Sequence, residues 1–216
     1  MTHGDKGLRL SRGAADPADP ADDNGVGSRA VFPCFMDFEA SSLRHGSYPI
    51  EVAWSLENGR IESWLIDPSG VPAWTDWDTE VERDTHGLSR DMLRLLGRSP
   101  RWVTRRLNTI FAGRALSCDG GQFDHFWLYR LFKAAGVRPT FELVDAGDLF
   151  ERYLAPATLT AFAEEARRLI GRRHRAALDV SYLQALWRLI AAQSDDAHWA
   201  TAAASQPVRA AGTCRA

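Results

Sequence analysis

The sequence predicts an α/β fold in which helices cover a mixed sheet. Strand-like runs come first, and two of them, within Ile50–Ile66, join across Asn58-Gly59. Asn-Gly is the strongest short signal for a β-hairpin, because both residues tolerate positive φ. Beyond the hairpin, helical and strand-like segments alternate, an order that suits a mixed sheet with helices packed on it.

Turn residues and apolar spacing define the individual elements. The first strand follows the apolar run from Val31 to Met36 and ends in Asp37-Phe38-Glu39. Ser89 caps a short helix that ends at Gly97, and Ser99-Pro100 begins the next helix. The remaining predicted elements are a strand at 114–118, a helix at 122–135 closed by a glycine, a strand at 141–146, and helices at about 158–170 and 176–192.

A chain of 216 residues with a net charge of -2 predicts one domain of ordinary size. Residues 1–29 are polar and lack periodicity, which predicts a disordered tail, and 194–216 form a second flexible tail rich in alanine. The folded domain is therefore expected at 30–193. The charge balance does not indicate a strongly basic nucleic-acid binder.

The localisation is predicted from the N-terminal sequence and from the spacing of the cysteines. No apolar signal segment opens the chain, and no apolar run approaches membrane-spanning length. The cysteines Cys34, Cys118 and Cys214 are widely separated, so neither a zinc ribbon nor a disulfide framework is expected. We expect a cytoplasmic protein that does not contact a membrane.

Several acidic residues lie at the ends of segments that are predicted to be buried. Asp37 and Glu39 point to one face of a strand, and two carboxylates there repel each other unless a cation lies between them. Asp124 lies in the first turn of a predicted helix, just after a strand. His174 and Asp179 are five positions apart, which is a rotation of about 500° and leaves them about 140° apart on a helix. His174 is therefore expected in the loop before the last helix, with Asp179 on that helix.

Three motifs together resemble a known family over residues 31–190. They are "DFE" at 37–39, "FD" at 123–124 after a strand, and "H-x-x-x-x-D" at 174–179. In this order they are similar to the DEDDh 3′→5′ exonucleases of the RNase T and DnaQ-like group, in the ribonuclease H-like superfamily. The resemblance implies a five-stranded mixed sheet in the order 3-2-1-4-5, with strand 2 antiparallel. It also implies that Asp37, Glu39, Asp124 and Asp179 are the metal ligands and that His174 is the catalytic histidine.

The chemistry of these residues agrees with that function. Four carboxylates suit two hard cations, Mg²⁺ or Mn²⁺, and such a pair stabilises the attacking and leaving oxygens of an in-line displacement. His174, with an ordinary pKa of about 6.5, is suited to act as the general base. The expected reaction removes nucleoside 5′-monophosphates from single-stranded 3′ ends of DNA or RNA.

Substrate contacts are predicted beside the acids. Relatives often carry Thr or Ser where this chain has Ala40, so a hydroxyl contact to the terminal nucleotide must come from elsewhere, such as Ser41 or a backbone amide. Leu43 or Phe123 is expected to wedge the terminal base. Arg175 belongs to a basic run that is interpreted equally well as a solvated helix end or as a contact to the substrate backbone.

Two further interpretations of the whole chain stay open. One is a non-catalytic nucleic-acid-binding protein on the same fold, and the other is a proofreading-type subunit held by a polymerase. A homodimer is a further possible assembly. Asp119 and Asp145 also follow strands and could approach the site, but turn chemistry accounts for both.

Overall fold

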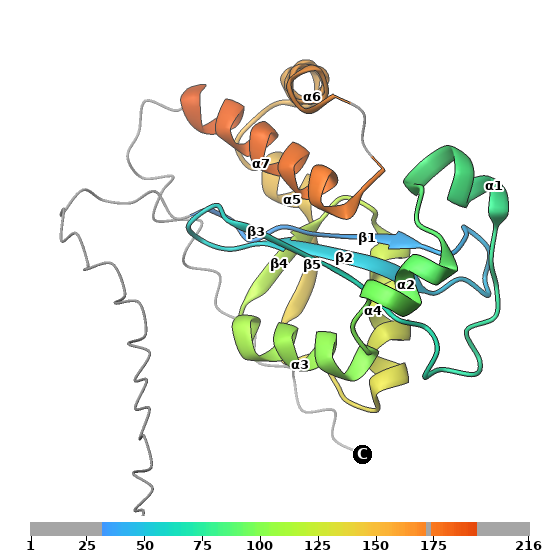
Figure 1. Ribbon diagram of the computed structural model, residues 1–216. Coiled ribbons are helices and arrows are strands. Elements are labelled where there is room, and N and C mark those ends of the chain that lie inside the picture. Colours follow the sequence, from blue (N-terminus) through green and yellow to red (C-terminus); the bar gives the residue numbers. More distant parts are fainter. Residues whose placement is uncertain (1–31, 172–173, 194–216) are drawn as a thin grey trace, which may run out of the picture.

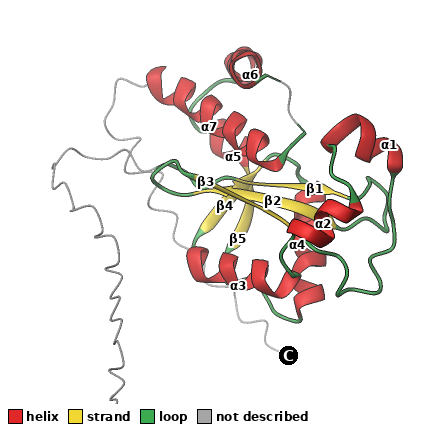
Figure 2. Ribbon diagram, viewed as in Figure 1, coloured by secondary structure: helices red, strands yellow, loops and turns green. Residues whose placement is uncertain are grey.

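The computed structural model describes residues 32–171 and 174–193. Strands lie in the centre, and helices lie on both sides of them (Figures 1 and 2). The mixed α/β class predicted from the sequence is therefore confirmed. The predicted tails, 1–29 and 194–216, lie outside the described residues.

Three antiparallel strands form the first sheet, in the order β1-β2-β3. They are β1 (Met36–Ala40), β2 (Pro49–Ser55) and β3 (Ile61–Leu65). The register places Asp37 opposite Ala53, and Glu39 opposite Glu51. The predicted antiparallel orientation of the second strand is confirmed.

The turn between β2 and β3 confirms the hairpin and corrects its geometry. Leu56 N donates to Arg60 O at 2.8 Å, so the turn encloses three residues rather than the two of Asn58-Gly59. Gly59 has φ +80°, whereas Asn58 does not adopt positive φ. The Asn58 side chain instead accepts a hydrogen bond from Arg60 N at 3.0 Å, as an Asx turn does.

The predicted continuous five-stranded sheet is wrong, because β4 (Ala115–Cys118) and β5 (Glu142–Asp145) form a separate parallel pair. One isolated bridge, Phe35 to Ser117, connects this pair to the first sheet. The physical reason is the length of β4. It ends one residue beyond the bridge, whereas β1 continues to Ala40. The polypeptide then turns into α4 (Gln122–Ala135), whose first turn lies near the acidic part of β1.

Alternation along the strands gives the first sheet two buried faces. Phe35 and Ala53 belong to the core beneath α7 (Ala176–Gln193) and α6 (Pro156–Ile170). Met36 and Val52 belong to the core against α3 (Pro100–Phe111) and α4. Asp37 and Glu39 share the α7 face with Phe35, because side chains two positions apart point the same way. The acids therefore lie at the end of an apolar face and not on a solvated one.

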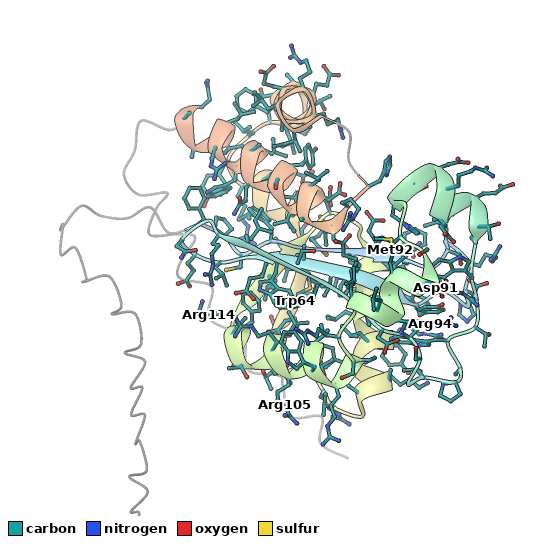
Figure 3. All side chains as sticks on the ribbon, viewed as in Figure 1. Trp64, Asp91, Met92, Arg94, Arg105 and Arg114 are labelled. Carbon is teal, nitrogen blue, oxygen red and sulfur yellow. The ribbon has the colours of Figure 1, made fainter. Side chains whose placement is uncertain are left out.

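The opposite face is held by aromatic contacts. Figure 3 shows Trp64 between the sheet and α3. Its ring centroid lies 4.6 Å from that of Trp102 on α3. Two predicted helix caps are also confirmed, since the Ser89 and Ser99 hydroxyls accept hydrogen bonds from the third residue beyond each of them.

Three short helical elements were not predicted. They are α1 (Thr79–Val81), the π-helical turn η1 (Glu82–His86) and α5 (Ala146–Phe150). Each is shorter than the two turns that a periodic pattern needs to be recognised. The predicted caps at Ser89 and Ser99 begin α2 (Arg90–Leu96) and α3. Within the described part of the chain, none of the helices combines the length and apolar character needed to cross a bilayer.

Gly97, where α2 returns to the edge of β3, yields a stability prediction. A Cβ there would lie 2.3 Å from Leu93 O and 2.7 Å from Asp67 N, both backbone atoms. We expect Gly97→Ala to lower the free energy of unfolding by about 1–3 kcal/mol, the cost of overpacking a fixed backbone. Urea unfolding measures it, with Gly70→Ala as the control, since nothing lies within 4 Å of a Cβ at Gly70. Equal stabilities of the two variants would contradict the close approach.

Candidate active site

Three acidic side chains from two elements meet at the end of β1. Asp37 and Glu39 come from β1, and Asp179 comes from the first turn of α7. A carboxylate oxygen of each lies within 4.8 Å of the others. Asp37 and Asp179 are buried, with 8% and 6% of their surface exposed. The geometry therefore brings together these three predicted ligands.

Asp124 joins the same region from the first turn of α4. It is buried, and Gly120 N donates to its Oδ2 at 3.0 Å. A Cβ at Gly120 would lie 2.6 Å from that oxygen, so the turn after β4 requires glycine for the carboxylate to fit. The charge of Asp124 raises the pKa of Asp37, and the charge of Asp179 raises the pKa of Asp124. The fourth predicted acid thus interacts electrostatically with Asp37 and Asp179.

Asp119 is a fifth acid, for which the sequence interpretation preferred a turn over an approach to the site. It follows β4 directly, and its charge raises the pKa of both Asp37 and Asp124. Its position after a strand that ends beside β1 was the available signal. The turn explains why an aspartate is favourable at position 119. It does not explain why this aspartate lies close enough to other carboxylates to raise their pKa values.

Burial and crowding determine the protonation of the cluster. The pKa of Asp37 is raised well above its ordinary value, first by burial and then by the charges of Asp124 and Asp179. Burial also raises the pKa of Asp124 to about 7, although the hydrogen bond from Gly120 N opposes the rise. Such a cluster is unfavourable when ionised and has oxygen ligands only. That donor set fits hard divalent cations such as Mg²⁺ or Mn²⁺.

His174 lies in the loop immediately before α7, as expected from its spacing to Asp179. Among the described residues other than glycine it alone has positive φ, at 85°. Its side chain is exposed, and its backbone N donates to Asp179 Oδ2 at 3.3 Å. His174 is thereby tied through its backbone to one of the acids. Arg172 and Arg173 of the same basic run lie outside the described residues.

The predicted substrate residues fall into two groups. Leu43 and Phe123 are 69% and 41% exposed and line a hollow of ≈ 450 Å³, together with Arg44, His45, Ser47, Gln122 and Phe126. Ala40 and Ser41 are buried, and the Ser41 hydroxyl accepts a hydrogen bond from Tyr48 N at 3.1 Å. Only the first group presents side-chain surface to a ligand.

Arg175 has an intramolecular partner that the sequence interpretation missed. Its guanidinium binds the carboxylate of Glu51 through two hydrogen bonds of 2.9 Å. Glu51 lies on β2 and is 1% exposed. A glutamate inside the apolar run "IEVAW" was a signal that a cation must approach the strand.

Comparisons with known proteins agree with this architecture. Neither a protein-family profile nor a curated protein sequence matches the chain. Several solved structures, in contrast, match the fold of this chain. The zinc-bound complex of E. coli exonuclease I with single-stranded DNA superposes with a TM-score of 0.57 at 15% identity, over 74% of this chain and 40% of that one. Exonuclease I from Methylocaldum szegediense gives 0.55 at 17% identity, with the same coverage.

The chain is similar in fold to exonuclease I. A product-bound exonuclease I superposes with a TM-score of 0.54 at 14% identity, over 73% of this chain and 42% of that one. At this level of sequence identity the likeness concerns the fold alone. The chain spans about 40% of the length of exonuclease I.

The raised pKa values predict an inverted pH dependence of stability. A carboxyl group with a raised pKa stabilises the fold fully below its unfolded pKa of about 4 and loses that contribution as pH rises through its folded pKa. For Asp124 the loss therefore begins near pH 4 and is complete just above pH 7. In EDTA we expect Asp124→Asn to be more stable than the parent at pH 8, by up to about 4 kcal/mol, since the pKa rises by roughly three units at about 1.4 kcal/mol each. The asparagine oxygen can still accept the hydrogen bond from Gly120.

Urea unfolding at pH 4, 6 and 8 measures this difference, which should disappear near pH 4. The exposed Asp148 supplies the control, since Asp148→Asn should follow the parent at each pH. A parallel pH dependence of Asp124→Asn and the parent would show that Asp124 is not crowded.

Proposed function

We propose that this protein is a metal-dependent 3′→5′ exonuclease that hydrolyses single-stranded nucleic acid from its 3′ end and releases nucleoside 5′-monophosphates. The convergence of Asp37, Glu39 and Asp179 within 4.8 Å is the observation that carries the proposal. Asp124 adds the fourth carboxylate from α4. Buried like charges at this spacing cost free energy, and a cation site is the function that makes use of them.

Each residue has a distinct role in the proposed reaction. Asp37, Glu39, Asp124 and Asp179 hold two Mg²⁺ or Mn²⁺ ions. When bound, such ions supply charge stabilisation for the attacking and leaving oxygens. His174 accepts the proton of the attacking water at an imidazole nitrogen, which requires the neutral ring.

The hollow beside α4 is the proposed site of the terminal nucleotide. Leu43 and Phe123 offer exposed apolar surface on which a base can pack. Solved complexes of exonuclease I contain dA16 and dT13 oligonucleotides, which favours single-stranded DNA as the first substrate to test. The oligonucleotide contacts of Ala40 and Ser41 stay predictions, and that of Arg175 competes with its observed pairing to Glu51.

Digestion of end-labelled oligonucleotides tests the function directly. DNA and RNA strands labelled at the 5′ or the 3′ end are incubated with Mg²⁺, with Mn²⁺ or with EDTA. A 5′-labelled ladder that shortens one nucleotide at a time, with release of labelled mononucleotide from the 3′ end, is expected with either metal and not with EDTA. Binding of the strands without digestion would favour the non-catalytic alternative.

Asp37→Ala and Asp179→Asn are expected to abolish digestion, because each removes a carboxylate from the cluster. Calorimetric titration with Mn²⁺ should show lost or much weaker binding in both variants, while circular dichroism shows an unchanged fold. Asp148→Asn again supplies the control. Unchanged Mn²⁺ binding in both variants would remove Asp37 and Asp179 from the ligand set.

His174→Ala separates proton transfer from metal binding. We expect kcat to fall about 10²–10⁴-fold, the range for loss of a general base. Mn²⁺ affinity should stay within about twofold of the parent, because His174 is not a proposed ligand. The parent kcat should rise with pH through the histidine pKa, and this limb should flatten in the variant. Near-parental activity with the parental pH profile would make His174 a bystander.

A further inference from the structure

Glu51 is a buried carboxylate whose hydrogen bonds all lead to the start of α7 or to the neighbouring strand. Its Oε1 accepts from Ser63 Oγ at 2.9 Å and from Arg175 Nη2 at 2.9 Å. Its Oε2 accepts from Arg175 Nε at 2.9 Å and from Ala176 N at 3.2 Å. Both oxygens therefore have two donors, which satisfies a carboxylate buried at 1% exposure.

These bonds make Glu51 a cap for α7 supplied by another element. Ala176 is the first residue of α7, and its N–H is one of the groups that a helix leaves without an intrahelical partner. A bidentate Arg–Glu pair is geometrically specific, because the planar guanidinium fork fits a carboxylate in one orientation. The two residues that follow His174 are thus attached to the middle strand of the first sheet.

His174 itself is held in a conformation that a side chain disfavours. A histidine at φ 85° costs free energy and persists only where the surroundings over-determine it. The bond from His174 N to Asp179 Oδ2 fixes one side of the residue, and the Glu51–Arg175 pair fixes the other. Segment 174–176 therefore has little freedom even though the His174 side chain is exposed.

We propose that Glu51 and Arg175 are positioning residues that orient His174 for proton transfer. This inference rests on the proposed exonuclease function. It assigns Arg175 a role through His174 and not through the nucleic acid. It also gives a role to an ion pair in which the Glu51 carboxylate is buried and the Arg175 side chain is partly exposed, because the bidentate fork fixes one orientation.

Two other roles of Arg175 make different predictions. Glu39 lies opposite Glu51 in the register, and the pKa of Arg175 is raised first by its hydrogen bond to Glu51 and also by the charge of Glu39. If Arg175 chiefly balanced the charge of Glu39, its removal would change Mn²⁺ affinity. If it bound the substrate backbone, its removal would raise KM.

The test compares Arg175→Lys, Arg175→Ala and Glu51→Gln with a matched control. Arg175→Lys loses the bidentate guanidinium fork but keeps a positive charge beside Glu51. It therefore tests the geometry of the pair and not its charge. Arg106→Ala is the control, because Arg106 also binds a glutamate of the first sheet, Glu62, through bonds of 2.9–3.3 Å. That pair joins α3 to β3. Glu62 is paired with Trp54 in the register, so its side chain lies on the α3 face of the first sheet, opposite to the α7 face that carries Glu51.

We expect kcat of Arg175→Lys to fall about 10–100-fold, as misplacement of a catalytic group does, with KM and Mn²⁺ affinity within about twofold of the parent. Arg106→Ala should keep the parental kcat. The decisive measurement places Arg175→Lys in the His174→Ala background, where it should lower kcat no further. Equal losses in both backgrounds, parental kcat, raised KM or weakened Mn²⁺ binding would each overturn the proposal.

A readout without catalysis separates this inference from the function. In protein labelled with ¹⁵N-histidine, Arg175→Lys should move the His174 ring signals towards those of a free peptide and leave in place those of His45, whose ring stacks on Phe126. If the parent digests no strand but Arg175→Lys still moves the His174 ring signals, the exonuclease function is refuted, whereas the positioning of His174 by Arg175 is retained. Unmoved His174 signals in an active variant would refute the positioning role alone.

Discussion

Repulsion among buried carboxylates is the constraint on which the rest of the structure depends. Three elements that are distant in sequence deliver Asp37, Asp124 and Asp179 to one place, and burial raises the pKa of the first two. A fold maintains such an arrangement only if the surrounding packing is strong. Here an apolar core lies on each face of the first sheet, and α4 and α7, which each carry one acid, belong to different cores. Displacing either acid would therefore disturb a whole packed layer.

The early end of β4 makes room for this cluster. A β4 as long as β1 would pair with β1 through Ala40 and carry the chain past the acids. Because β4 ends at Cys118, the turn at Gly120 can direct α4 so that its first turn faces β1. The interruption of the sheet and the position of Asp124 both follow from the short length of β4.

The sequence predicted those features that depend on local spacing. Alternation in "DFE" gave the shared face of Asp37 and Glu39, the five-residue spacing placed His174 before α7, and Ser89 and Ser99 marked helix starts. It did not predict features that depend on the partner in space. Pairing of β1 with β4 requires knowing where both strands end, and Glu51 looks like an anomaly in an apolar strand until Arg175 is found beside it. Asp119 was assigned to a turn for the same reason, because a turn and a carboxylate cluster need the same residue type.

Two helices begin at the acidic cluster, with Asp124 and Asp179 in their first turns. Aligned peptide dipoles place roughly half a positive charge at the start of each helix. The backbone itself thus carries part of the counter-charge into the cluster, and no side-chain substitution can remove it. The carboxylates are consequently somewhat less repulsive than their formal charges suggest, and the direction of the two helices contributes to the field at the cluster together with the acids.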